Sequence, residues 1–173
     1  MKYFIVSDIH GNLEAMQSVL KEMKKEKPDV KVCLGDIVGY GPDPDECTEL
    51  AFSVFDVIVA GNHDQAVTGQ YSTDTFNPLA RMAVEWSQTQ ITEKNIARLK
   101  SLNLITIKNN LTFVHATPSA PGQFEYILST YKAKNDFPDL TTPLCFIGHT
   151  HIPIIYTQHK KGNVKQVMEK SLH

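Results

Sequence analysis

Short apolar runs alternate with helical patterns through the first sixty residues. Three runs that are typical of buried strands lie at residues 3–7, 31–34 and 56–60. Between the first two runs, apolar side chains recur at the spacing of one helix face: Leu13, Met16, Leu20 and Met23. Asn12 can cap that helix, and a second helix is expected over residues 45–52. Strands that alternate with helices in this way predict a parallel sheet in an α/β fold.

The middle of the chain has longer helical patterns, followed by a hairpin pattern. Two apolar stripes predict two helices in an outer layer, the first with Leu79, Met82, Ala83 and Trp86, the second with Ile96, Leu99 and Leu102. A hairpin is expected from strands at 104–108 and 111–115, joined by Asn109-Asn110. The elements expected after it are a helix over 125–134, strands over 144–147 and 152–157, and a lysine-rich hairpin-like segment over 159–167.

Side chains that can bind metals follow the predicted strands in five short segments. These segments are Asp8-Ile9-His10, Gly35-Asp36, Gly61-Asn62-His63-Asp64, His115 and Gly148-His149-Thr150-His151. In an open α/β sheet, ligand sites form at the carboxyl ends of the strands. Side chains two residues apart in an extended chain point to the same side. We therefore expect Asp8 and His10 to aim at one point, and His149 and His151 likewise.

Each segment alone has an ordinary structural explanation. An Asp-x-His pair is usually a surface or capping feature, and Gly-Asn-His-Asp alone is typical of a turn. These explanations do not account for five of the seven histidines lying at predicted strand ends beside two aspartates and an asparagine. Oxygen and imidazole ligands suit divalent first-row metals. Seven candidate ligands exceed the four of one tetrahedral ion, which favours two adjacent ions that share a carboxylate.

The order of these segments, D-x-H, G-D, G-N-H-D, H and G-H-x-H, resembles that of the calcineurin-like metallophosphoesterases between Asp8 and His151. The resemblance implies a four-layer α-β-β-α sandwich in a single domain over residues 1–173. Because only 22 residues follow His151, the second sheet is expected to be shortened at its C-terminal end. An exposed strand edge left by this shortening would favour a homo-oligomer.

The resemblance also implies a role for each polar residue. The first metal would be held by Asp8, His10 and His151, and the second by Asn62, His115 and His149. Asp36 would bridge the two ions. His63 would face the substrate without binding metal, oriented by Asp64. The metals expected are manganese, iron, zinc, nickel or cobalt, with manganese favoured.

These roles imply hydrolysis of a small phosphate ester. Two cations lower the pKa of a bridging water, so a hydroxide nucleophile exists near neutral pH. His63 would protonate or stabilise the departing oxygen. A phosphodiesterase is the favoured function. The alternatives are a phosphomonoesterase or a dinucleoside polyphosphate hydrolase of the same superfamily, a nuclease, and a non-catalytic metal-binding scaffold.

Composition and charge narrow these alternatives. The chain has 173 residues, of which 42% are hydrophobic, and this suits one buried core. With 17 basic and 19 acidic residues, a formal net charge of −2 argues against a nucleic-acid partner and so against a nuclease. Tyr40 and Ala60 stand where phosphoprotein phosphatases and symmetrical dinucleoside tetraphosphatases carry arginines, in G-D-x-V-D-R-G and R-G-N-H-E. A protein phosphatase is therefore disfavoured.

Three widely spaced cysteines (Cys33, Cys47 and Cys145), with no CxxC pair, indicate a reducing compartment, and the cytoplasm is expected. No apolar run is long enough to span a membrane. Loops at 39–44, 68–78 and 116–124 are expected to set specificity. Their aromatic residues Tyr40, Tyr71 and Phe124 could stack on an aromatic leaving group, but packing within the loops is the preferred interpretation. The lysines at positions 21, 24, 25 and 27 are expected to form a solvated helix face.

Overall fold

A parallel three-stranded sheet is built from the first third of the chain, in the order β1-β2-β3. Its strands are β1 (Tyr3–Val6), β2 (Val30–Cys33) and β3 (Val57–Ile58). The structure, a computed structural model, describes residues 1–159 and 162–167. The three strands coincide with the predicted apolar runs to within one or two residues at each end, which confirms the α/β prediction.

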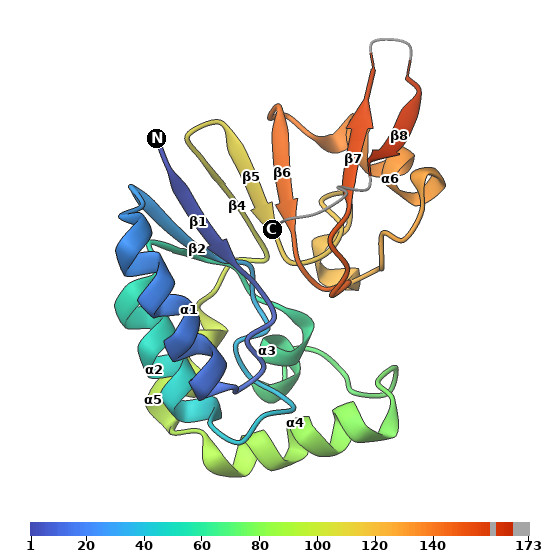
Figure 1. Ribbon diagram of the computed structural model, residues 1–173. Coiled ribbons are helices and arrows are strands. Elements are labelled where there is room, and N and C mark those ends of the chain that lie inside the picture. The colour runs from blue at the N-terminus through green and yellow to red at the C-terminus, as the bar shows by residue number, and fades with distance from the viewer. Residues whose placement is uncertain (160–161, 168–173) are drawn as a thin grey trace.

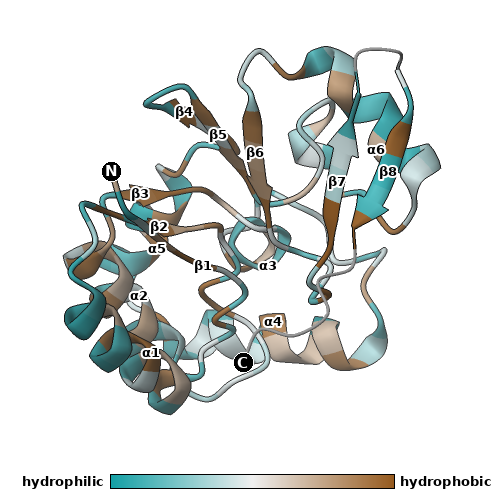
Figure 2. Ribbon diagram, turned by 45° about the horizontal axis from the view of Figure 1, so that its top comes forward, coloured by the Kyte–Doolittle hydropathy of each residue, from teal (hydrophilic) through white to brown (hydrophobic). Residues whose placement is uncertain are grey.

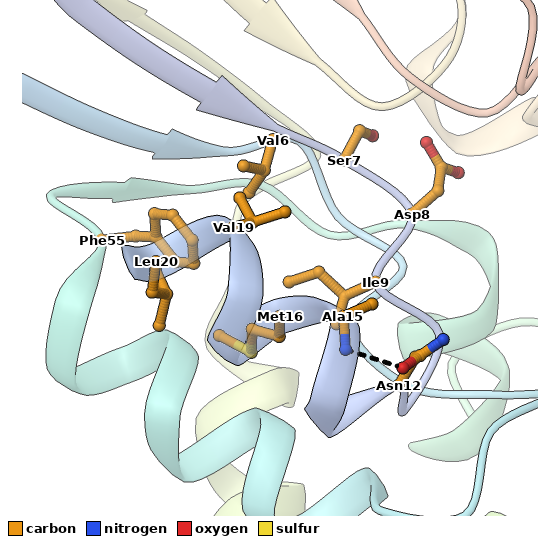
Figure 3. A pocket seen from close by; sticks show the side chains of 10 residues that line it. All are labelled: Val6, Ser7, Asp8, Ile9, Asn12, Ala15, Met16, Val19, Leu20 and Phe55. Atoms are coloured by element: carbon orange, nitrogen blue, oxygen red, sulfur yellow. Dashed lines mark hydrogen bonds between the residues drawn. The ribbon is translucent and has the colours of Figure 1, made fainter. Parts of the chain in front are cut away.

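Helices cover one face of this sheet: α1 (Leu13–Glu26), α2 (Pro44–Val54) and α5 (Glu93–Lys100) (Figure 1). The cap of α1 is the predicted one, since Oδ1 of Asn12 accepts a hydrogen bond of 2.9 Å from the N–H of Ala15 (Figure 3). The apolar face of α1 is buried in a core shared with β1 and β2. The four lysines of the predicted solvated face are all exposed, as expected.

Two further helices, α3 (Asn62–Val67) and α4 (Pro78–Gln90), follow β3. The apolar stripe predicted to pack α4 is wrong, because Leu79, Met82 and Trp86 are 73%, 63% and 42% exposed. The buried face of α4 consists instead of smaller side chains, Ala80, Val84 and Ser87. Small residues let α4 approach α3 closely enough for the side-chain amide of Gln88 to donate hydrogen bonds to two main-chain carbonyls there. The stripe predicted for α5 is correct at its centre, since Leu99 is fully buried.

A second three-stranded sheet packs against the open face of the first. It contains β4 (Ile105–Lys108), β5 (Leu111–Val114) and β6 (Leu144–Ile147), in the order β4-β5-β6. β4 and β5 form the predicted antiparallel hairpin, whereas β6 runs parallel to β5. Phe113 stacks on Phe146 with ring centroids 5.6 Å apart, and both belong to the core between the sheets. Helices, first sheet and second sheet therefore form three successive layers (Figure 1).

The C-terminal strands do not extend the second sheet. β7 (Ile155–Gln158) and β8 (Val164–Val167) pair with each other in an antiparallel ribbon, and residues 160–161 of the predicted hairpin lie outside the described residues. Figure 2 shows that β6 is hydrophobic along its length, whereas β8 combines hydrophobic and hydrophilic residues. Ile105 and Ile107, which point away from the first sheet, are 37% and 57% exposed. In the described part of the chain, the outer face of the second sheet is thus incompletely covered.

Helix α6 (Thr130–Asp136) lies beside this ribbon (Figure 1). It begins later than the predicted helix over 125–134, because the side chain of Ser129 caps it by accepting a hydrogen bond from the N–H of Lys132. Two short 3-10 turns flank this region, η1 (Pro121–Gln123) and η2 (Phe137–Asp139). Among the residues that the structure describes, no helix combines the length and apolarity that crossing a membrane requires.

Candidate metal centre

The five polar segments converge at the carboxyl ends of strands from both sheets. Asp8 and His10 follow β1, and Asp36 follows β2. Asn62 and His63 begin α3, directly after β3. Two further segments come from the second sheet, His115 after β5 and His149 with His151 after β6. Since β5 and β6 are parallel, their carboxyl ends reach the same edge.

The donor atoms of these residues form three overlapping groups, within each of which they lie no more than 4.8 Å apart. The groups are Asp8 with His10 and His151, His10 with Asp36 and His63, and Asp36 with His115 and His149. Oδ1 of Asn62 lies 3.2 Å from Nε2 of His115. All seven candidate ligands therefore belong to one cluster, together with His63.

Main-chain carbonyls orient three of the histidine rings. Nδ1 of His10 lies 3.2 Å from the carbonyl of Val38, and Nδ1 of His115 lies 2.7 Å from that of Leu34. The third bond joins Nε2 of His149 to the carbonyl of Phe124, over 2.8 Å. A carbonyl only accepts hydrogen bonds, so the ring N–H lies at that nitrogen and the other nitrogen is free to bind a cation. This donor set, imidazole and carboxylate without thiolate, fits a divalent metal.

Asp36 occupies the middle of the cluster. Its Oδ2 lies 3.2 Å from Nε2 of His115 and 3.8 Å from Nε2 of His10. Its Oδ1 accepts a hydrogen bond of 2.8 Å from the N–H of His63. At one side of the cluster, Oδ1 of Asp8 lies 3.2 Å from Nε2 of His151. The carboxylate of Asp36 therefore lies between the imidazoles of His115 and His10.

Five of the seven candidate ligands have left-handed backbone, with φ between 51° and 65°: Asp8, His10, Asp36, His149 and His151. The expectation that the Asp-x-His and His-x-His pairs converge because their backbone is extended is therefore wrong. They converge although the backbone at the strand ends is left-handed and not extended. Figure 3 shows that the side chains of Asp8 and Ile9 point in different directions. Non-glycine residues in this conformation are strained and gather at functional sites.

The carboxylate of Asp64 lies beneath the cluster and holds the chain around it. It accepts main-chain hydrogen bonds from Asp36 (2.8 Å), Ile37 (2.9 Å), Val38 (3.3 Å) and Gly61 (2.9 Å). Burial and the charge of Asp36 raise the pKa of Asp64 to about 7, while hydrogen bonds from Gly61 and Val38 favour its anion. Among the described residues, no hydrogen bond joins Asp64 to the ring of His63. Asp64 thus contacts the loop of Asp36, and not the imidazole that it was expected to orient.

His63 is almost fully buried, and its Nδ1 has no hydrogen-bond partner among the described residues. Burial lowers the pKa of His63 to about 4, against the opposing charge of Asp36, so its ring is neutral at pH 7. Gly39, at φ 88°, makes room for the ring, because a Cβ at that position would meet Nδ1 of His63. The sequence reasoning missed Gly39, although it stands where G-D-x-V-D-R-G has its second aspartate.

Asp36 and His115 each have the other as the main charge that shifts their pKa. Burial opposes the charge on each, but His115, His63 and His10 together hold the pKa of Asp36 well below its ordinary value. For His115, burial alone would lower the pKa, yet the charge and hydrogen bond of Asp36 raise it to about 9. Without a cation the site therefore holds an ion pair, and the proton on His115 must leave before Nε2 can bind a metal.

Comparison with known proteins shows the family to which the chain belongs. The sequence pattern of the calcineurin-like phosphoesterases matches residues 1–164, and the chain belongs to this family. The family resemblance read from the motifs is confirmed. An uncharacterized protein of Methanocaldococcus jannaschii is 38% identical over 170 residues, which are 92% of this chain and 65% of that protein. Serine/threonine-protein phosphatase 1 of Salmonella typhimurium is 25% identical over 103 residues, 59% of this chain and 47% of that protein.

Among solved structures, the metallophosphoesterase from Sphaerobacter thermophilus superposes with a TM-score of 0.80 at 42% sequence identity. The match covers 94% of this chain and 65% of that one. The chain thus spans 65% of the length of both the archaeal relative and this structural neighbour. The mixed α/β fold predicted from the sequence agrees with this neighbour.

Proposed function

We propose that this protein is a metal-dependent phosphoesterase that hydrolyses a small phosphodiester. The observation that carries the proposal is the single cluster of carboxylate, amide and imidazole donors at the strand ends, with three imidazoles oriented by main-chain carbonyls. Membership of the calcineurin-like phosphoesterase family supports the same activity.

The cluster would hold two divalent cations. Asp8, His10 and His151 are the proposed ligands of the first, and Asn62, His115 and His149 those of the second, with Asp36 shared. When bound, such a pair of cations supplies Lewis-acid chemistry that activates water and neutralises phosphoryl charge. Of manganese, iron, zinc, nickel and cobalt, which all suit nitrogen and oxygen donors, we favour manganese.

His63 is the proposed catalytic residue that is not a ligand. Its main-chain N–H is fixed to Asp36, so the ring keeps a constant position relative to the proposed bridging carboxylate. The ring is neutral at pH 7 and keeps one N–H, which can donate a hydrogen bond to the departing ester oxygen. Asp64 acts through the main chain of Asp36 and is therefore a positioning residue.

The cavity at the cluster, of about 220 Å³, favours a diester over a monoester. It is lined by His10, Asp36, Tyr40, Asn62, His63, Tyr126, His149, Thr150 and His151. A monoester carries one more negative charge than a diester, and none of these lining residues is a lysine or arginine. The same feature argues against a nuclease, which needs cations along the strand. A phosphomonoesterase or a dinucleoside polyphosphate hydrolase is the second candidate, because the proposed cations could supply the missing positive charge.

Residues 1–173 are proposed to form a single domain. The three cysteines are unpaired, and Cys33 and Cys47 are buried, which supports a reducing compartment and the cytoplasm as the proposed location. The exposed isoleucines on the outer face of the second sheet support a homo-oligomer.

The test is hydrolysis of bis-p-nitrophenyl phosphate by the full chain, with manganese and with a chelator. We expect turnover that requires manganese and that falls ~10²-fold or more in His63→Ala while the bound manganese stays constant. His159→Ala is the matched control, because His159 is exposed and lies outside the cluster. Bound manganese without turnover would contradict the phosphodiesterase, and no bound metal in the folded protein would favour the scaffold.

A further inference from the structure

A second cavity, of about 440 Å³, adjoins the metal cluster. It shares several lining residues with the smaller one, Tyr40, Asn62, His63, Tyr126 and His149. Its remaining wall comes from residues 71–80 and from residues 123–125. Its volume is in the range of small-molecule sites. A phosphate ester bound at the cluster would therefore have space for one of its organic groups beside His63.

Aromatic rings dominate the walls of this cavity: Tyr40, Tyr71, Phe76, Phe124 and Tyr126. Phe124 is buried, and Tyr71, from the loop at 68–78, stands edge-on to it with ring centroids 5.0 Å apart. Tyr126 is different, because its ring stacks on His149 at 4.0 Å and is 54% exposed. Tyr40 is 49% exposed, and Tyr71 is half-buried at the wall. Packing is the preferred interpretation for Tyr40, Tyr71 and Phe124. Buried Phe124 fits it, whereas Tyr40 and Tyr71 pack on neighbouring rings and also line the cavity.

The charge of the cavity selects what it can hold. No lysine or arginine is among its lining residues, and its one carboxylate, Glu125, is paired with Lys132 at 2.5 Å. A second phosphate or another anion would find no cationic side chain there. Neutral polar groups are present, namely the amide of Gln123, the hydroxyl of Thr75 and the amide of Asn77, whose Oδ1 already accepts a hydrogen bond from the N–H of Ala80. Side-chain amides pair well with the hydrogen-bonding edges of purines.

We propose that this cavity binds the nucleoside of a nucleotide phosphodiester, with its base against Tyr71 and Tyr126 and its phosphate at the metal cluster. The aromatic walls supply stacking, and the amides supply hydrogen bonds. The lack of lysine and arginine among the lining residues disfavours an anionic substituent. This inference rests on the proposed function and narrows its substrate class.

The test compares two ligands that carry the same phosphate and differ in the base. Binding of adenosine 5′-monophosphate and of ribose 5-phosphate to the manganese-loaded full chain is measured by calorimetry. We expect the nucleotide to bind ~10-fold more tightly or better, since stacking on an aromatic side chain accounts for a difference of this size. Tyr71→Ala should reduce this preference several-fold, whereas Tyr71→Phe, which keeps the ring, should retain most of it.

Two further variants complete the design. Tyr126→Ala repeats the test at an exposed ring, so the proposal does not depend on whether Tyr71→Ala folds, and its manganese content is measured in parallel. Tyr131→Ala removes a tyrosine that is 74% exposed on α6 and does not line the cavity, and should leave the preference intact. Equal affinity for the two ligands, or a preference that survives both alanine variants, would overturn the proposal. A preference for the nucleotide in a protein that does not hydrolyse bis-p-nitrophenyl phosphate would instead refute only the proposed activity.

Discussion

The carboxylate of Asp64 accepts a hydrogen bond of 2.8 Å from the main-chain N–H of Asp36, the residue at the middle of the metal cluster. Three more N–H groups donate to the same carboxylate, and Asp64 is fully buried. A carboxylate can accept all four bonds because both of its oxygens are acceptors. The position of Asp36 therefore depends on the carboxyl group of Asp64.

Asp64→Asn should lower both stability and manganese affinity. The NH2 group that replaces one oxygen only donates hydrogen bonds and would face main-chain N–H donors, at a cost of ~3 kcal/mol in unfolding free energy. Chemical denaturation and manganese titration measure the two effects. Asp56→Asn is the matched control, since the exposed Asp56 also accepts a main-chain hydrogen bond, from Lys31, and should lose less than ~1 kcal/mol. Lost turnover at unchanged stability and manganese affinity would instead favour the original interpretation that Asp64 orients His63.

Local patterns were sufficient to predict the strands, the hairpin and the capped helix α1. The strand ends in turn placed the polar segments at one edge, because the carboxyl ends of parallel strands meet there. The rule acts within each sheet, and the contact of His115 with Asp36 depends in addition on how the two sheets pack, because β2 and β5 belong to different sheets. Sequence spacing thus predicted which residues meet, without giving the backbone conformation that brings them together.

What could not be predicted depends on contacts between distant segments. Helix α4 has two possible faces, and only packing against α3 decides that Ala80 and Val84 are buried while Met82 is exposed. The bonds from Asp64 to the loop of Asp36 join residues 28 positions apart. No local pattern distinguishes such a carboxylate from one that orients the adjacent His63.

Single substitutions should remove the proposed cations one at a time. The unchanged protein is expected to bind about two manganese ions per chain. His151→Ala and His115→Ala should each leave about one ion at the same free manganese concentration, since each removes a ligand of a different ion. Asp36→Ala should lose most of both, because Asp36 is shared. Elemental analysis after dialysis gives these ratios, and equal losses in all three variants would argue against two separate sites.

Binding of manganese should release a proton from His115. Its pKa of about 9 in the metal-free protein exceeds the ordinary value of 6.5, so its protonated form stabilises the fold below pH 6.5. That stability is lost as the pH rises from 6.5 through 9, a range in which His63 stays neutral. Calorimetry in buffers of different ionisation enthalpy should give about one proton per chain at pH 7 and fewer as the pH passes 9. Manganese binding with no proton release at pH 7 would show that Asp36 and His115 are not paired.

Gly39 and Gly69 offer a matched pair for testing whether His63 needs its present position. Both have left-handed backbone, at φ 88° and 77°, so alanine is strained at either one, by ~1 kcal/mol. A Cβ at position 69 meets nothing within 4 Å, whereas one at position 39 would enter the space of the His63 ring. Gly69→Ala should therefore lose a little stability and keep its turnover. Gly39→Ala should lose the same amount of stability from backbone strain. It should also displace the ring of His63 and lose much of its turnover.

Manganese content makes this comparison specific to His63. Gly39 is not among the proposed ligands, so Gly39→Ala should keep its manganese, as His63→Ala should, even where turnover falls ~10²-fold. The double variant with Gly39→Ala and His63→Ala should be no slower than His63→Ala alone, because the two changes remove the same interaction. An additive loss in the double variant would mean that Gly39 supports activity through the loop of Asp36, independently of the imidazole.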